Sequence, residues 1–149
     1  ETFDGLDPVM RQGIKGILAK EMEERELTLV IASHNLRELE DICDHIGLLH
    51  RGGVLLSKDL SDLKCSMHKV QCVFEPDFGT SLSEVFQILQ MKQTGRLVSM
   101  IVRENEEEIR RKMEELSPVY YETLPLSLEE IFISETEVVG YDIKKLILG

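Results

Sequence analysis

The first half of the fold is decided by LTLVIASHNLRELEDICDHIGLLHRGGVLLS, residues 27–57. Its opening segment, Leu27–Ser33, is mostly apolar without alternation, which is typical of a strand covered on both faces in a parallel sheet. Asn35 can cap a short helix after that strand. The apolar runs on either side of the Arg51-Gly-Gly turn predict a β-hairpin. A buried strand followed by a helix favours an α/β fold for this part of the chain.

A helix is predicted on the N-terminal side of this stretch, from Pro8 to about Arg25. Asp7 is a good N-cap, and proline is favoured at the first helical position. Apolar residues then recur at helical spacing, at Met10, Ile14, Ile17, Leu18 and Met22. On the C-terminal side, a short helix at about 59–64 closes this part. We therefore place a first domain at residues 1–64.

The pattern changes in residues 65–149, which we assign to a second domain. KVQCVFE alternates as a half-buried strand does, ILQMKQ-TGR-LVSMIVR predicts a hairpin, and VYYETL predicts a further strand. A helix is expected before the hairpin and another after it, with Asn105 as the cap of the second. The order βαββαβ over 69–124 predicts an α+β ferredoxin-like domain. Its helices should cover one sheet face and bury four apolar residues: Phe86, Leu89, Ile109 and Met113.

Composition excludes several classes of function. The 149 residues carry a formal net charge of −11, whereas nucleic-acid binding requires clustered Lys and Arg, so we expect no nucleic-acid partner. No apolar run approaches the ~20 residues that span a bilayer. The three cysteines lack the spacing of a metal site, and we interpret them as reduced and mostly buried. His45 and His50 fit no zinc pattern either, so no metal site is predicted.

Two residues carry the chemistry of the first domain. His34 directly follows the predicted strand, and the carboxyl ends of strands are where open α/β sheets bind ligands. Glu1 would lie at the same edge if a strand preceded it. A carboxylate there can take a proton from water, and an imidazole can donate a hydrogen bond to a developing anion. In the alternative interpretation neither residue has a catalytic role: Glu1 is only a terminal residue, and His34 is only a polar residue before a helix cap.

The motif ETFDGLDP, followed by SHNLRELEDICDHIGLLHRGGVL, resembles the C-terminal half of the ATP-binding subunit of an ABC transporter of the exporter type. The resemblance covers residues 1–64 and implies part of a RecA-type P-loop NTPase core. It implies that Glu1 is the Walker B glutamate that acts on the attacking water. It also implies that Asp7 is the D-loop aspartate that couples two ATP sites in a dimer. Ser33 and His34 would form the switch motif, whose histidine contacts the γ-phosphate.

The chain also departs from the family pattern. Thr2 stands where proline is usual, and no G-x-x-x-x-G-K-[ST] occurs, although that loop supplies the backbone N–H groups and the lysine that cradle phosphates. The LSGGQ-type signature is absent too. We therefore interpret the sequence as lacking the first half of a nucleotide-binding domain. The parent is expected to use ATP and Mg²⁺, whereas this fragment alone should be inactive and hold no cofactor.

The resemblance implies two partners: an integral membrane permease subunit and a second ATPase subunit. It implies a cytoplasmic location, peripheral at the inner face of the membrane. One alternative is a non-transport ABC ATPase that acts in translation or DNA repair, which the negative net charge of the chain disfavours. Another is that residues 65–149 form a regulatory or dimerisation module, which is compatible with the transporter interpretation. The transported substrate is chosen by the permease and is not encoded here.

Overall fold

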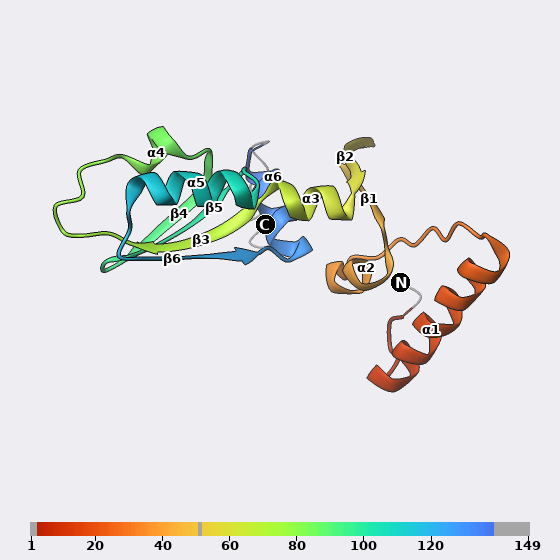
Figure 1. The fold of residues 1–149 in the computed structure, drawn as a ribbon. Coiled ribbons are helices and arrows are strands. Elements are labelled where there is room, and N and C mark those ends of the chain that lie inside the picture. Colours follow the sequence, from red (N-terminus) through yellow and green to blue (C-terminus); the bar gives the residue numbers. More distant parts are fainter. Residues whose placement is uncertain (1–2, 51, 139–149) are drawn as a thin grey trace. The chain divides into compact units, whose positions relative to one another are not determined.

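The computed structural model describes residues 3–50 and 52–138 and shows a mixed α/β fold with two antiparallel sheets (Figure 1). The chain divides into two compact units, Glu1–Ser57 and Lys58–Gly149. This division assigns helix α3 (Leu60–Ser66) to the second unit, whereas the sequence-based boundary at residues 64/65 assigns most of it to the first. Helix α3 contacts α6 (Leu128–Val138), which explains its place in the second unit.

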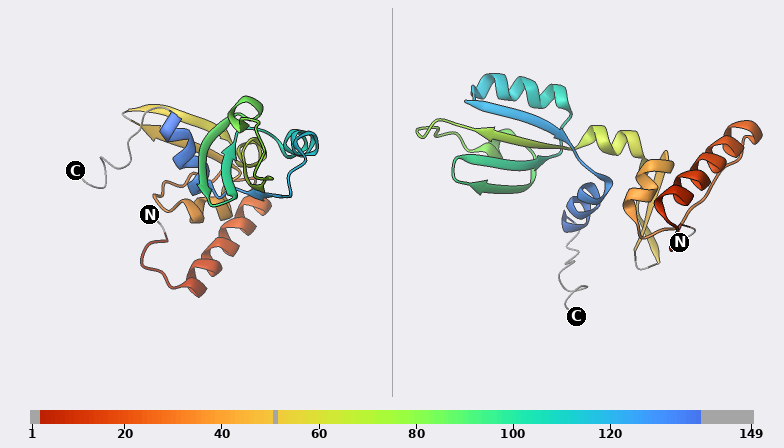
Figure 2. Two further views of the ribbon diagram at one scale, coloured as in Figure 1. Left: turned by 90° about the vertical axis from the view of Figure 1, so that its left-hand side faces the viewer. Right: turned by 90° about the horizontal axis from the view of Figure 1, so that it is seen from below.

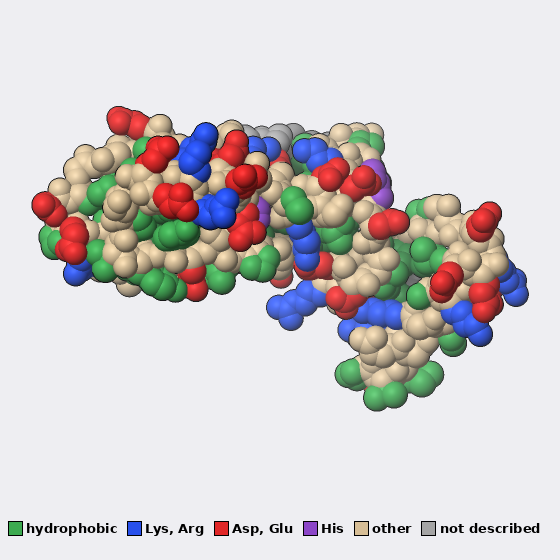
Figure 3. All heavy atoms as spheres, in the orientation of Figure 1, with side chains coloured by type: hydrophobic (Ala, Val, Ile, Leu, Met, Phe, Trp, Pro, Cys, Tyr) green, Lys and Arg blue, Asp and Glu red, His purple; other side chains and the backbone are tan. Residues whose placement is uncertain are grey.

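The first unit contains α1 (Pro8–Arg25), α2 (Leu36–Ile42) and most of a hairpin of β1 (His45–His50) and β2 (Gly53–Asp59), whose last two residues belong to the second unit. The predicted helix, its cap and the hairpin are confirmed. Helix α1 ends at Arg25, and its C-cap Glu26 has a φ of 50°, in the left-handed region. Apolar side chains gather at the N-terminal end of α1 in Figure 3, where Val9 and Met10 are 80% and 55% exposed.

The predicted strand Leu27–Ser33 is wrong. The segment is not a strand and belongs to neither of the described sheets, and Val30 is 90% exposed. A strand exists only through hydrogen bonds to a neighbouring strand, and a segment that is apolar on both faces also needs a layer over each face. The described residues supply neither a neighbouring strand nor a layer over each face of the segment. The parallel sheet of a RecA-type core is accordingly not among the elements that the structure describes.

The second unit confirms the predicted order βαββαβ. After α3 it contains β3 (His68–Val73), α4 (Leu82–Val85), β4 (Ile88–Thr94), β5 (Leu97–Val102), α5 (Glu106–Leu116), β6 (Tyr120–Pro125) and α6. The four strands form one antiparallel sheet in the order β4-β5-β3-β6. In the central strand, Val70 lies opposite Met100 on one side and opposite Thr123 on the other. Figure 2 shows α5 lying along one face of this sheet.

The core of the second unit lies between that sheet face and the helices α4 and α5. It consists of alternate residues of β3 and β5 together with residues of the α4 and α5 segments: Val70, Cys72, Phe74, Phe86, Met100, Val102, Ile109 and Met113. Leu89 was predicted to join it but is only half-buried in β4. The reason is that α4 lasts a single turn. Phe86 is already extended, with φ −112° and ψ 145°, so the next residues enter the strand.

Helix α6 begins with the predicted capping box. The Ser127 amide donates to Glu130 Oε2 at 3.0 Å, and the Glu130 amide donates to Ser127 Oγ at 3.2 Å. The Ser127 amide is the main cause that lowers the pKa of the Glu130 carboxyl from its ordinary 4.5. Lys69 of β3 lies 3.5 Å from the same carboxylate. The capping box thus fixes the start of α6, and the lysine ties it to the sheet.

Burial of the cysteines is less complete than predicted. Cys72 is fully buried in the core, Cys43 is half-buried, and Cys65 is exposed at the end of α3. Burial raises the pKa of the Cys72 thiol to about 11. Burial, and secondarily the charge of Asp44, raises the pKa of the Cys43 thiol. None of the three cysteines forms a disulfide in the structure.

Candidate functional site

Asp7 lies at the N-terminus of α1, on the loop that leads into the helix. Its Oδ1 accepts hydrogen bonds from the amides of Val9 and Met10, both at 2.9 Å. These contacts satisfy two amides that a helix N-terminus otherwise leaves without partners, an effect worth ~1 kcal/mol. The carboxylate is exposed and sits at the positive end of an 18-residue helix. Asp7 is thus held rigidly while it stays accessible.

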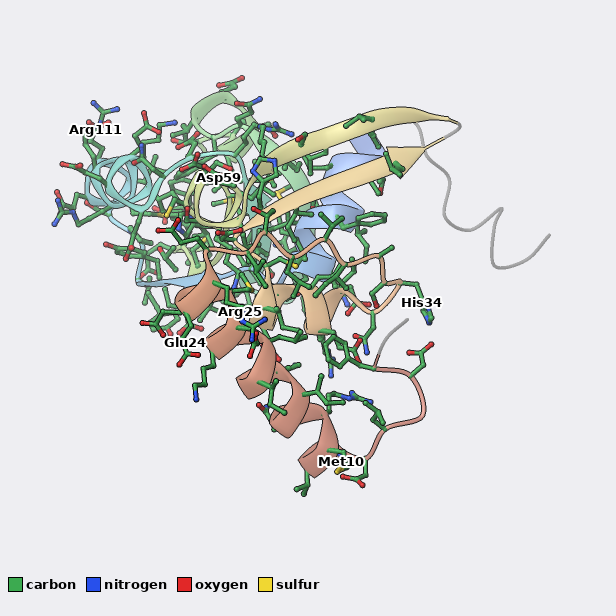
Figure 4. All side chains as sticks on the ribbon, turned by 90° about the vertical axis from the view of Figure 1, so that its right-hand side faces the viewer. Met10, Glu24, Arg25, His34, Asp59 and Arg111 are labelled. Atoms are coloured by element: carbon green, nitrogen blue, oxygen red, sulfur yellow. The ribbon has the colours of Figure 1, made fainter. Side chains whose placement is uncertain are left out.

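Ser33 and His34 lie on the loop that precedes α2. Ser33 Oγ accepts the amide of Asn35 at 3.0 Å, which fixes the turn around His34. His34 is exposed, and Figure 4 shows its side chain projecting outward from this loop. Asn35 is the N-cap of α2, as predicted, but its side chain makes no capping hydrogen bond. The local structure therefore presents an accessible imidazole at a defined turn.

An ion pair that was not predicted from the sequence links α1 and α2, the helices that follow the two loops. Arg11 Nη1 of α1 lies 3.1 Å from Glu38 Oε1 of α2. The same guanidinium donates from Nη2 to the carbonyl of Leu6, at 3.3 Å. Glu38 is only 3% exposed, and neither of its carboxylate oxygens has a hydrogen-bond partner of good geometry. The sequence spacing pointed to this ion pair. Arg11 follows Asp7 by one helical turn, and Glu38 follows His34 by one helical turn.

A second ion pair joins the same helices farther from the loops. Lys15 Nζ lies 2.9 Å from Asp41 Oδ2. Here the carboxylate is 61% exposed, in contrast to the buried carboxylate of Glu38. Solvent screens such a pair, so its contribution to stability is small. Both ion pairs thus join α1 to α2, one through a buried carboxylate and the other through an exposed carboxylate.

The predicted site is only partly visible. Glu1 lies outside the described residues, so its position relative to His34 stays a prediction. Over residues 3–50 and 52–138 there is no cluster of three or more His, Cys, Asp or Glu side chains that could hold a metal. Among the same residues, no helix is long and apolar enough to cross a membrane. Among the described residues, the Arg11–Glu38 ion pair joins the helix that follows the Asp7 loop to the helix that follows the His34 loop.

Comparison with known proteins gives one consistent result, although no protein-family model matches the chain. The ABC transporter ATP-binding protein YtrB of Bacillus subtilis is 31% identical over 135 residues, which are 91% of this chain and 46% of YtrB. The bacitracin transport ATP-binding protein BcrA of Bacillus licheniformis is 34% identical over 64 residues, 43% of this chain and 21% of BcrA.

The methionine import ATP-binding protein MetN of Staphylococcus saprophyticus is 30% identical over 103 residues, 65% of this chain and 30% of MetN. The chain therefore spans about half the length, or less, of these relatives. The alignment with YtrB extends over nearly the whole chain and so is not confined to the motifs of the first unit. These relationships, which extend over most of the chain, show that its curated homologues are ATP-binding proteins of ABC transporters.

Proposed function

We propose that this chain is part of the ATP-hydrolysing subunit that powers an ABC membrane transporter. The observation that carries the proposal is that Asp7 and His34 lie on two loops of one compact unit, and that the helices which follow these loops are joined by the Arg11–Glu38 ion pair. Support comes from relatives whose names describe ATP-binding proteins of transporters. The chain covers less than half of each of these proteins, so the activity is inferred for the longer parent.

In the proposed reaction, ATP is hydrolysed and this chain supplies part of the surroundings of the γ-phosphate. Glu1 would accept a proton from the attacking water, and His34 would donate a hydrogen bond to the phosphoryl oxygens as their charge develops. Asp7 would face the second subunit and couple the two sites. Bound Mg²⁺ would offset charge on the phosphates.

The described residues fit this role only as a contribution to a shared site. His34 and Asp7 are accessible side chains on fixed loops, which suits contact with a ligand or a partner. No phosphate-cradling loop of the G-x-x-x-x-G-K-[ST] type is present in the sequence. Most phosphate contacts must therefore come from elsewhere in the parent, and the fragment alone should neither bind nor hydrolyse ATP.

The second unit is proposed to be a ferredoxin-like module with a regulatory or dimerising role. The order βαββαβ and the antiparallel sheet β4-β5-β3-β6 support that description. Its two edge strands, β4 and β6, offer backbone groups to which a second copy could pair. We further propose an integral membrane permease and a second ATPase subunit as partners. The location would be cytoplasmic, peripheral at the inner face of the membrane.

A variant series in the full-length parent tests the catalytic assignment. Glu1→Gln and His34→Ala should each lower ATP turnover by ~10²–10⁴-fold, because each removes an interaction of the transition state, while nucleotide binding is retained. His45→Ala is the matched control. His45 is an exposed histidine of the same unit that pairs with Ser57 on the hairpin. Near-normal turnover in Glu1→Gln or His34→Ala would refute the assignment of that residue.

A further inference from the structure

We propose that Arg11 and Glu38 are positioning residues that hold the Asp7 loop and the His34 loop in one fixed arrangement. The inference rests on the proposed function, since it concerns two loops that we assign to the ATP site. It adds two residues that the sequence motifs do not include. The evidence is a chain of contacts that runs from one loop to the other through a single buried carboxylate.

The first part of that chain starts at the Asp7 loop. The Leu6 amide donates to the Phe3 carbonyl at 3.3 Å, and Phe3 is only 1% exposed, so this turn is anchored in the unit. Arg11 reaches back from the first turn of α1 to the Leu6 carbonyl. The guanidinium thereby restrains the backbone next to Asp7, in addition to the capping bonds that Asp7 itself makes.

The second part runs from Glu38 to His34. The Glu38 amide donates to the Asn35 carbonyl at 3.1 Å, and the Asn35 amide donates to Ser33 Oγ. His34 lies between Ser33 and Asn35 in the chain. A displacement of Glu38 therefore moves the first turn of α2 and, with it, the turn that carries His34.

The chemistry of the pair explains why arginine is needed. A guanidinium presents several donors in a rigid planar fork, so it can contact the Leu6 carbonyl and the Glu38 carboxylate at the same time. A lysine ammonium is a point charge on a flexible stem and would satisfy the carboxylate first. Glu38 is buried, so loss of its cationic partner leaves a charge that water does not compensate. Both loops consequently depend on Arg11.

Hydrogen exchange on the complete 149-residue chain tests the linkage without any nucleotide. The probes are the amides of Val9 and Met10, which report the Asp7 cap, and the amide of Asn35, which reports the turn at His34. Glu38→Gln should speed exchange at both places by about tenfold, because local opening becomes easier. The matched control is Asp41→Asn, which removes the other ion pair between the same helices and should leave these amides within about twofold of wild type.

Arg11→Lys gives a second and different pattern. The charge opposite Glu38 is kept, so exchange at Asn35 should stay near wild type, whereas exchange at Val9 and Met10 should rise because the Leu6 contact is lost. This variant keeps the proposal testable if Glu38→Gln fails to fold. The proposal is overturned if Arg11→Lys leaves the Val9 and Met10 amides unchanged. An equal effect of Glu38→Gln and Asp41→Asn at Asn35 overturns it as well.

Steady-state kinetics of the full-length parent separate this inference from the proposed function. Glu38→Gln should lower kcat for ATP about tenfold or more with KM little changed, because loop placement matters most in the transition state. Asp41→Asn should match wild type. A wild-type parent without ATPase activity would refute the proposed function and leave the exchange result standing. An active parent whose kcat is unaffected by Glu38→Gln would refute the inference alone.

Discussion

Replacing Lys112 by methionine should destabilise the second unit markedly, although lysine lies on a helix surface. Lys112 Nζ of α5 lies 2.6 Å from Glu104 Oε1, and the amide of Gln87 donates to the same oxygen at 3.0 Å. Glu104 is 7% exposed, and its Oε2 is buried without a hydrogen-bond partner. Lys112 is therefore the cation that compensates a buried carboxylate.

The magnitude follows from that burial. Removing one partner of a buried ion pair typically costs 3–5 kcal/mol, because an uncompensated charge is left behind. The Lys112 side chain is 22% exposed, so solvent reaches part of the pair, and we place the loss at the lower end, about 3 kcal/mol. Methionine keeps most of the packing of the aliphatic stem, so the loss reports charge rather than volume. Converting Glu104 to leucine at the same time should recover most of the loss, since no buried charge then remains.

Urea unfolding measures these differences. The chain has no tryptophan, and its three tyrosines, at positions 120, 121 and 141, all belong to the second unit, so tyrosine fluorescence follows that unit. Lys69→Met is the matched control. Its partner Glu130 lies 3.5 Å away with 38% of its side chain exposed, so the loss should stay below ~1 kcal/mol. A loss below ~1 kcal/mol for Lys112→Met, or additive losses in the double variant, would refute the reasoning.

Three further predictions concern protonation, thiol reactivity and nucleotide. Because the folded-state pKa of Glu130 lies below its ordinary 4.5, its ionised form stabilises the fold above pH 4.5, and this contribution is lost as pH falls through the folded value. Glu130→Gln should hence be less stable than wild type at pH 7, with a difference that shrinks in acid, measured by urea unfolding at several pH values; a difference independent of pH contradicts this. Iodoacetamide at pH 8 should alkylate the exposed Cys65 and leave Cys72 intact, because Cys72 is buried and its pKa is about 11. Mass spectrometry of peptides checks this order, and alkylation of Cys72 as fast as that of Cys65 contradicts the prediction. Millimolar Mg-ATP should leave the melting temperature of the 149-residue chain unchanged, since a site without its phosphate-cradling loop gives no ligand stabilisation, and a saturable thermal shift would show a nucleotide site within the chain.

Local rules predicted the elements whose determinants lie within a few residues. Helix α1 begins and ends as expected because Asp7, Pro8 and the apolar spacing act within the helix itself. The alternating strands of the second unit and the capping box at Ser127 were predictable for the same reason. The Asp7 and Ser33-His34 motifs were recognisable as short stretches of sequence, independent of tertiary contacts.

The sequence-based predictions failed where the structure of a segment depends on more than its own local pattern. Leu27–Ser33 has the composition of a buried strand, but a strand needs a neighbouring strand, and no strand of the two described sheets pairs with this segment. Leu89 continues a helical spacing from Phe86, yet the backbone turns to strand at once, so the period alone misplaced it. The Arg11–Glu38 pair joins residues 27 positions apart on separate helices, and such contacts leave only a faint mark in the sequence.

The position of β3 in the sheet has a consequence for how the second unit is made. β3 is the first of the four strands to leave the ribosome, yet it lies between β5 and β6, with His68 opposite Val102 on one side and opposite Pro125 on the other. The hairpin β4-β5 can close locally and cover one edge of β3. The other edge must wait for β6, more than 50 residues after β3 begins. In a nascent chain whose residues Tyr120–Pro125 have not yet left the ribosome, one edge of β3 therefore has no strand to pair with. If synthesis stops there, the product should be prone to aggregate through that edge.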